Sequence, residues 1–183
     1  HAPGGLSVFT LVIGGAASGK SEYAEELILA SPLRPRIYIA TMEPFGAEGQ
    51  ARIARHRELR RGKGFQTVER YTGIAGLKLP AGGAVLLECL GNLAANELYS
   101  PAGAGTAEGA ASAVADGVDA LLAQCGELVA VGNEVCSGGR DYAGDTERYL
   151  RTLAEIHRRL ARRADRVCEV VCGIPVWHKG AGA

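Results

Sequence analysis

The chain lacks three features that would each point to a class of protein: an excess of charge of one sign, a long apolar run and paired cysteines. Lys and Arg number 20, and so do Asp and Glu, which argues against broad binding to nucleic acid or to a membrane surface. No apolar run approaches the roughly 18–20 residues that a membrane-spanning helix needs. We therefore expect no nucleic-acid partner and no membrane span.

The cysteines are few and scattered, and they are odd in number: Cys89, Cys125, Cys136, Cys168 and Cys172. They lack the spacing of a zinc site, so buried reduced thiols in a cytoplasmic protein are the better interpretation. The first residues also lack the charged and apolar segments of a secretory signal. We expect residues 1–6 to be an unstructured leader or an expression remnant, and residues 7–180 to form one domain.

Short apolar runs alternate with stretches of helical spacing along the chain. The runs that predict strands are 8–13, 36–40, 84–88, 128–132 and 167–172. The stretches that predict helices are 20–30, 48–61, 90–99, 110–124 and 146–164. Wholly apolar strands that alternate with helices predict an α/β fold, with a mostly parallel central sheet and helices on both faces. We expect a surface loop at 102–109 and a frayed tail around His178.

The most specific motif lies between the first predicted strand and helix. Residues 14–21, Gly-Gly-Ala-Ala-Ser-Gly-Lys-Ser, fit the phosphate-loop pattern G-x-x-x-x-G-K-[ST]. Glycines let successive amides curl around phosphates, and the following helix adds its dipole. Lys20 would sit between the β- and γ-phosphates, and Ser21 would bind Mg²⁺. A shuffled chain would contain this pattern about 0.6% of the time, so we predict a nucleoside triphosphate site that serves group transfer.

A histidine lies between arginines on the second predicted helix. Arg52, His56 and Arg60 are spaced i, i+4, i+8 and so share one helix face. Two guanidinium groups would keep the imidazole neutral and could hold phosphate oxygens during attack on phosphorus. Histidine readily forms a phosphoramidate that can be transferred. On pattern alone an exposed, arginine-rich helix face is the commoner explanation, so both stay open.

Acidic residues follow several predicted strands. Glu88 ends the third strand, at the sheet edge where ligands collect and where phosphate-loop proteins place an acidic residue facing Mg²⁺. We therefore predict a functional role for Glu88. Glu69 follows the short segment 65–68, and Glu134 follows the fourth strand. For these two residues, ligand binding and simple capping of a turn are equally supported.

Several landmarks occur together in one known family. They are the phosphate loop, Tyr38-Ile39-Ala40-Thr41, Arg52-Ile53 followed by His56-Arg57, Thr67-Val68-Glu69, Leu86-Leu87-Glu88-Cys89-Leu90, Asn133-Glu134-Val135 and Gly173-Ile174-Pro175-Val176. From about Thr10 to Lys179, their order and spacing resemble the bifunctional adenosylcobinamide kinase / adenosylcobinamide-phosphate guanylyltransferase family of cobalamin biosynthesis. The resemblance implies a RecA-like P-loop NTPase fold.

The resemblance also implies two activities. The first transfers the γ-phosphate of ATP or GTP to adenosylcobinamide. The second transfers GMP from GTP to adenosylcobinamide phosphate through a GMP–histidine intermediate, which yields adenosylcobinamide-GDP and pyrophosphate. His56 matches the guanylylated histidine of the family, which turns our preference toward a catalytic role for it, beside Lys20.

The resemblance further implies which residues contact nucleotide. They are Gly14, Gly15, Ala16, Ala17, Ser18, Gly19, Lys20, Ser21, Ala40, Thr41, Met42, Arg57, Glu58, Leu59, Arg60, Glu69 and Glu88. Mg²⁺ is the expected metal, held by ATP or GTP and by Ser21. A homo-oligomer such as a trimer is also expected.

Three features depart from the family pattern. Ala17 stands where Arg is common, His157 lies near a position that is often Asn, and the segment 136–142 replaces a Gly-rich segment that contains Pro. These departures concern the corrinoid contacts more than the nucleotide site. Two other functions stay open: a small-molecule kinase in which His56 only binds phosphate, and a nucleotide-dependent switch protein. The chain has no N-K-x-D motif for guanine, which disfavours a GTPase switch.

Overall fold

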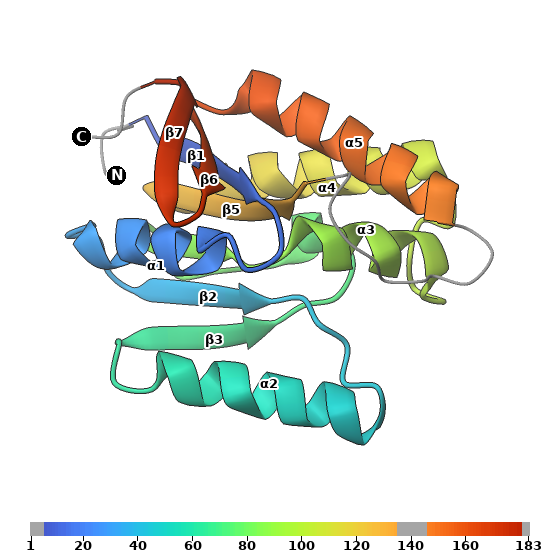
Figure 1. Ribbon diagram of the computed structural model, residues 1–183, viewed down its shortest axis with the longest axis horizontal. Helices are drawn as coiled ribbons and strands as arrows, with labels where there is room; N and C mark the ends of the chain where they lie inside the picture. The colour runs from blue at the N-terminus through green and yellow to red at the C-terminus, as the bar shows by residue number, and fades with distance from the viewer. Residues whose placement is uncertain (1–5, 135–145, 181–183) are drawn as a thin grey trace.

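A seven-stranded sheet forms the centre of the computed structural model, which describes residues 6–134 and 146–180 (Figure 1). The strand order is β3-β2-β4-β5-β1-β6-β7. The strands are β1 (Val8–Gly14), β2 (Arg36–Ala40), β3 (Phe65–Glu69), β4 (Ala84–Leu87), β5 (Glu127–Asn133), β6 (Arg166–Val171) and β7 (Ile174–Lys179). All neighbours in this sheet are parallel except β6 and β7. The predicted α/β fold with a mostly parallel sheet is confirmed.

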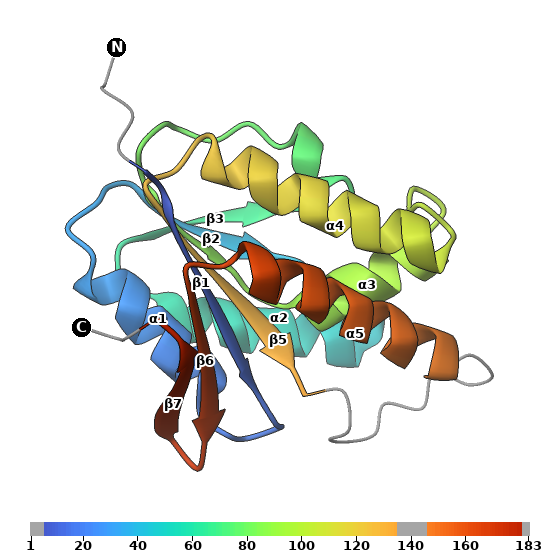
Figure 2. The same ribbon diagram turned by 90° about the horizontal axis from the view of Figure 1, so that it is seen from above.

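Helices cover both faces of the sheet (Figure 2). They are α1 (Lys20–Ala30), α2 (Gly46–Arg60), α3 (Leu90–Tyr99), α4 (Ala107–Leu122) and α5 (Thr146–Arg163), with a short 3-10 turn at Ile74–Gly76. The helices α3, α4 and α5 pack on one face, where Leu93, Val118 and Leu153 join the larger hydrophobic cluster. On the opposite face, Ile28 of α1 packs with Val12 of β1 in the smaller cluster.

The central strands are buried on both sides because alternate residues supply alternate clusters. In β1, Phe9 and Leu11 belong to the larger cluster, whereas Val12 belongs to the smaller one. This explains why the strands are apolar throughout instead of alternating between apolar and polar residues. Parallel strands also bring their carboxyl ends to one edge, where loops that bind ligands gather.

The C-terminal tail corrects one prediction. Residues around His178 were expected to fray, but they form β7, which pairs with β6 in an antiparallel hairpin. Cys172 and Gly173 take φ angles of 49° and 77°, which allows the tight turn between the two strands. Trp177 then packs edge-on against Tyr23 of α1, with ring centroids 6.3 Å apart. The sequence did not predict β7, because this strand forms only by pairing with β6.

Several element boundaries also differ from the predictions. Helix α4 begins at Ala107, within the segment predicted to be a loop, because the Thr106 side chain accepts a hydrogen bond from the Gly109 amide at 3.0 Å and caps the helix. Helix α2 begins at Gly46, two residues before the predicted start. The segment 65–68 belongs to an edge strand, β3.

The thiols follow the prediction only in part. Cys125 and Cys168 are buried and Cys89 is half-buried, but Cys172 is exposed in the turn before β7. Cys136, with the departing segment 136–142, lies outside the described residues. None of the helices in the described part of the chain combines the length and the apolar character that crossing a bilayer requires.

Candidate functional site

The phosphate-loop motif lies where β1 passes into α1. The absence of a side chain at Gly14 lets Ser18 and the backbone of β6 lie close to it, because a Cβ there would lie 2.4 Å from Ser18 Oγ and 2.9 Å from the Val170 carbonyl oxygen. Ala17 and Gly19 have φ angles of 56° and 89°, the left-handed region that turns successive amides inward. The predicted strand–loop–helix context of the motif is therefore present.

The side chains of this loop suit an anionic ligand. Lys20 Nζ donates to the Gly15 carbonyl oxygen at 3.1 Å, which holds the ammonium group over the loop. The Ser18 hydroxyl is buried and has no hydrogen-bond partner among the described residues. Ser21 is exposed in the first turn of α1, one residue after Lys20. A buried hydroxyl without a partner beside a lysine and free helix amides fits triphosphate oxygens, and the Ser21 hydroxyl fits their Mg²⁺.

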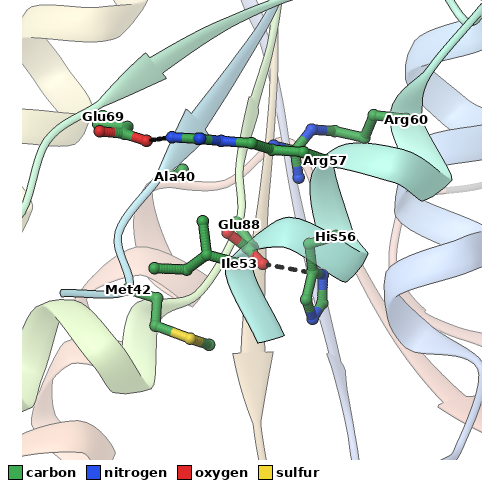
Figure 3. A pocket seen from close by; sticks show the side chains of 8 residues that line it. All are labelled: Ala40, Met42, Ile53, His56, Arg57, Arg60, Glu69 and Glu88. Carbon is green, nitrogen blue, oxygen red and sulfur yellow. Dashed lines mark hydrogen bonds and ion pairs between the residues drawn. The ribbon is translucent and has the colours of Figure 1, made fainter. Parts of the chain in front are cut away.

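A second site gathers at the carboxyl ends of β2, β3 and β4, against α2 (Figure 3). Its pocket is lined by Ala40, Met42, Ile53, His56, Arg57, Arg60, Glu69 and Glu88. All of these except Ile53 are among the residues that the sequence predicted. Ile53 was missed, although its place three residues before His56 puts it on the same helix face.

The imidazole of His56 faces a carboxylate in this pocket. His56 Nδ1 lies 3.5 Å from Glu88 Oε1, and the His56 side chain is 41% exposed whereas that of Glu88 is 14% exposed. A carboxylate at Nδ1 favours the tautomer with its proton on that nitrogen, which leaves the lone pair on Nε2. The pair therefore resembles an oriented nucleophile more than a solvated surface histidine.

The arginines near His56 contact other groups. Arg57 forms an ion pair with Glu69, whose other oxygen accepts a hydrogen bond from the Tyr71 hydroxyl at 3.3 Å. Arg60 is only 7% exposed, and its guanidinium lies over the Tyr38 ring, 3.7 Å from the centroid. His56 and Arg60 of the predicted face therefore both line the pocket, but Arg60 turns onto the Tyr38 ring while His56 turns toward Glu88.

Outside the phosphate loop, three predicted nucleotide-binding residues do not line the pocket. Thr41 is fully buried, and its hydroxyl donates to the Cys89 carbonyl oxygen at 3.2 Å. Glu58 pairs with Arg61 on the exposed side of α2, and Leu59 is 61% exposed. Their spacing from His56 directs these last two side chains away from the sheet, which the family resemblance alone did not reveal.

The phosphate loop and the histidine are separated in the sheet. The loop follows β1, whereas His56 lines a pocket with Ala40 at the end of β2 and Glu88 after β4, and β5 lies between β1 and β4. At a strand spacing of about 4.8 Å, β1 and β2 are roughly 14 Å apart. No residue of the phosphate loop lines the His56 pocket. The two predicted catalytic side chains, Lys20 and His56, therefore belong to different parts of the same sheet edge.

A group of ionisable side chains also lies beside the phosphate loop. The Glu134 amide donates to the Gly14 carbonyl oxygen at 3.1 Å. A hydrogen bond shared with Glu169 raises the pKa of the Glu134 carboxyl. His178 Nε2 lies 3.0 Å from Glu169 Oε1, and this contact together with Glu134 lowers the pKa of Glu169. The sequence did not single out Glu169, because β6 and β7 must pair before it meets His178. Within the described ranges no cluster of three or more His, Cys, Asp or Glu residues could hold a metal ion by itself.

Fold and site together define a class of protein. A phosphate loop joins β1 to α1, and one strand separates β1 from the strand that is followed by an acidic residue, as in RecA-like P-loop NTPases. Comparison with known sequences defines the family: the chain belongs to the cobinamide kinase / cobinamide phosphate guanyltransferase family, whose model matches residues 10–177. The resemblance inferred from the motifs is confirmed.

Curated relatives match along almost their whole length. The chain is 35% identical over 182 residues to the bifunctional adenosylcobalamin biosynthesis protein CobU of Salmonella typhimurium, covering 92% of this chain and 98% of that protein. It is 32% identical to the bifunctional adenosylcobalamin biosynthesis protein CobP of Pseudomonas aeruginosa, covering 93% and 96%. Among solved structures, the signal recognition particle receptor FtsY of Elizabethkingia anophelis, in complex with GDP, aligns with a TM-score of 0.41 at 14% identity. That alignment covers 91% of this chain and 41% of the FtsY chain.

Proposed function

We propose that the chain phosphorylates adenosylcobinamide with ATP or GTP, and that it then transfers GMP from GTP to adenosylcobinamide phosphate through a GMP–His56 intermediate. The products of the second step are adenosylcobinamide-GDP and pyrophosphate. Membership of the kinase and guanyltransferase family supports both activities. The observation that carries the proposal is the His56–Glu88 pair, which lies in a pocket apart from the phosphate loop.

The kinase step would use the β1–α1 junction. Amides of the loop and the Lys20 ammonium would hold the β- and γ-phosphates, so the γ-phosphorus faces the substrate hydroxyl. A bond then forms between that hydroxyl oxygen and the γ-phosphorus, the bond to the β-bridging oxygen breaks, and the hydroxyl proton leaves. Ser21 would hold Mg²⁺ with the nucleotide, and the metal would neutralise charge on the phosphates.

The guanylyl step would use the His56 pocket. Glu88 at Nδ1 leaves Nε2 free to attack the α-phosphorus of GTP, which forms a nitrogen–phosphorus bond and releases pyrophosphate. The same carboxylate would stabilise the positive charge that develops on the imidazole. A phosphate oxygen of adenosylcobinamide phosphate then attacks the same phosphorus and displaces Nε2, which regenerates the free histidine.

The remaining site assignments belong to this proposal. Arg57, Glu69, Ala40 and Met42 would contact the nucleotide during guanylyl transfer, since they line the pocket with His56. The phosphate-loop residues would hold the triphosphate during both steps. We further propose that the enzyme acts in the cytoplasm as a homo-oligomer, such as a trimer, which rests on the family resemblance.

GTP labelled at the α-phosphate tests the proposal. Wild-type protein should acquire label that is acid-labile and alkali-stable, as expected for a phosphoramidate, and His56→Ala should acquire none. The same His56→Ala protein should still transfer γ-phosphate to adenosylcobinamide. His178→Ala, which removes an exposed histidine outside the pocket, is the matched control and should keep the α-label. If wild type transfers only γ-phosphate, the chain is a simple kinase and the guanylyl assignment is wrong.

A further inference from the structure

Tyr38 lies beneath the His56 pocket, and the proposed reaction gives it no role. It is in the middle of β2 and is 5% exposed. Its ring meets Phe65 of β3 edge-on, with centroids 5.8 Å apart and an interplanar angle of 81°. The Arg60 guanidinium covers the ring at 3.7 Å from its centroid. The C-terminal end of α2 therefore packs on the sheet through the contact between Arg60 and the Tyr38 ring.

Helix α2 has few other buried contacts, because its Arg57–Glu69 ion pair lies at the surface. Of its 15 residues, Arg60 is the single one that is buried. A desolvated guanidinium over an aromatic face is stabilising, and Arg60 also donates to Thr67 Oγ1 at 3.5 Å. The position of His56, one helical turn before Arg60, therefore depends on the contact between Arg60 and Tyr38.

The Tyr38 side chain also interacts with Glu88, the carboxylate that faces His56. Burial, together with the charge of Glu88 and a side-chain hydrogen bond to it, raises the pKa of Tyr38 well above its usual range, while Arg60 opposes this shift. Tyr38 pairs with Leu86 across β2 and β4, so its side chain lies on the same face as that of Glu88, two residues farther along, and the protonated phenol can donate to that carboxylate. A carboxylate that faces an imidazole with one oxygen can still rotate, and a second donor restricts that rotation.

We propose that Tyr38 is a positioning residue for guanylyl transfer: its ring holds the Arg60 guanidinium that anchors α2, and its hydroxyl holds the Glu88 carboxylate against His56 Nδ1. This inference rests on the proposed function, because it concerns the attack of His56 on the α-phosphorus. Tyr38 itself touches neither the imidazole nor the reacting phosphorus and acts through Glu88 and Arg60.

The variant Tyr38→Phe isolates the hydroxyl, because it keeps the ring beneath Arg60. At saturating GTP, attachment of the α-label should slow about tenfold, the effect of losing one hydrogen bond to a charged group. The GTP concentration for half-saturation and the rate of γ-phosphate transfer should each stay within about twofold, since the phosphate loop is untouched. Tyr23→Phe, at a half-buried tyrosine of α1, is the matched control and should label at the wild-type rate.

A double-mutant cycle shows whether Tyr38 acts through Glu88. Glu88→Gln should slow α-labelling by itself, since it removes the charge that faces His56. Adding Tyr38→Phe to Glu88→Gln should then slow labelling by less than about twofold, because the contact that it would break is already weakened. A loss caused by general damage to the fold would instead multiply the two effects.

Several results would overturn the role of Tyr38. They are a wild-type labelling rate in Tyr38→Phe, an equal fall in γ-phosphate transfer, multiplicative effects with Glu88→Gln, or loss of the folded state measured by thermal unfolding. Failure of the proposed function looks different, because wild type would then acquire no α-label or His56→Ala would keep it. That outcome needs no Tyr38 variant, and it removes the positioning role together with the guanylyl step.

Discussion

Helices α1 and α2 carry the two proposed catalytic side chains, Lys20 and His56, but they are held in very different ways. Helix α1 buries Ala24 and Ile28 against the sheet, and its first residues continue directly from β1 through a loop of fixed shape. The loop is also tied to the β6–β7 turn, where the Gly173 amide donates to the Ser18 carbonyl oxygen at 2.7 Å. Helix α2 buries only Arg60.

This difference follows from what each helix must do in the proposed reaction. A triphosphate is bound by many backbone amides at once, so those amides must already point inward before it arrives. A nucleophile that takes GMP from one ligand and gives it to another must meet two partners. A helix with one buried anchor can shift with little loss of packing, since stability is lowest where few apolar contacts are made.

The largest effect should come from Lys20, at the start of the firmly packed helix α1. Lys20→Ala should lower both γ-phosphate transfer and α-labelling by at least about 100-fold, because both steps use the triphosphate that Lys20 holds. Nucleotide affinity should fall, while thermal unfolding should stay close to wild type. Unchanged nucleotide affinity would contradict the assignment of the phosphate loop.

A smaller and more selective effect should come from the anchor of α2. Arg60→Ala should slow α-labelling about tenfold or more but leave γ-phosphate transfer within about twofold, because it frees α2 and not α1. Hydrogen exchange should become faster by a similar factor at α2 amides and stay unchanged at α1. Arg61→Ala is the matched control, since Arg61 is adjacent and its side chain is 79% exposed. Faster exchange in both helices would show that the two are not held independently.

The last effect concerns stability and not activity, and it lies in α5, a helix held more firmly than α2. His157 packs so closely on β5 that a Cβ at Gly132 would lie 2.4 Å from His157 Nε2, and burial lowers the His157 pKa to about 4. The unfolded chain, with a pKa of about 6.5, binds more protons than the folded chain between these values, so stability falls as pH drops from about 6.5 to 4.

Denaturant unfolding at pH 7 and pH 4.5 measures this effect. Wild type should lose about 2 kcal/mol more than His157→Asn between the two pH values, and below about pH 4 the difference should stop growing. Equal losses in both proteins would show that His157 is not kept neutral by burial. Hydrogen exchange at pH 4.5 should then locate the loosening in α5 and not in α2.

The sequence predicted which residues form the site, but it could not predict where their side chains point. Seven predicted residues line the pocket, because the family motif places them on α2 and at the ends of strands. Sequence spacing put Arg52, His56 and Arg60 on one face, but it could not show that Arg60 would turn onto Tyr38. Such a turn depends on a neighbouring strand, and helix periodicity carries no information about that neighbour.

The fold shows the same division. Apolar runs and helical spacing were enough for five strands and five helices, since those signals are local. The edge strands β3 and β7 were not recognised as strands, because their exposed residues lack the continuous apolar pattern of buried strands. The start of α4 depended on the cap at Thr106, which is a local signal that was overlooked.

By itself the sequence determined the class of fold, the phosphate loop and the family, because each rests on residues close together in the chain or on a repeated pattern of polarity. Only the tertiary structure decided that Glu88 faces His56, that the Arg60 guanidinium lies over the Tyr38 ring, and that the two proposed catalytic groups lie apart. These features depend on which strands become neighbours and on the rotamers of side chains from distant segments, and packing in three dimensions selects both.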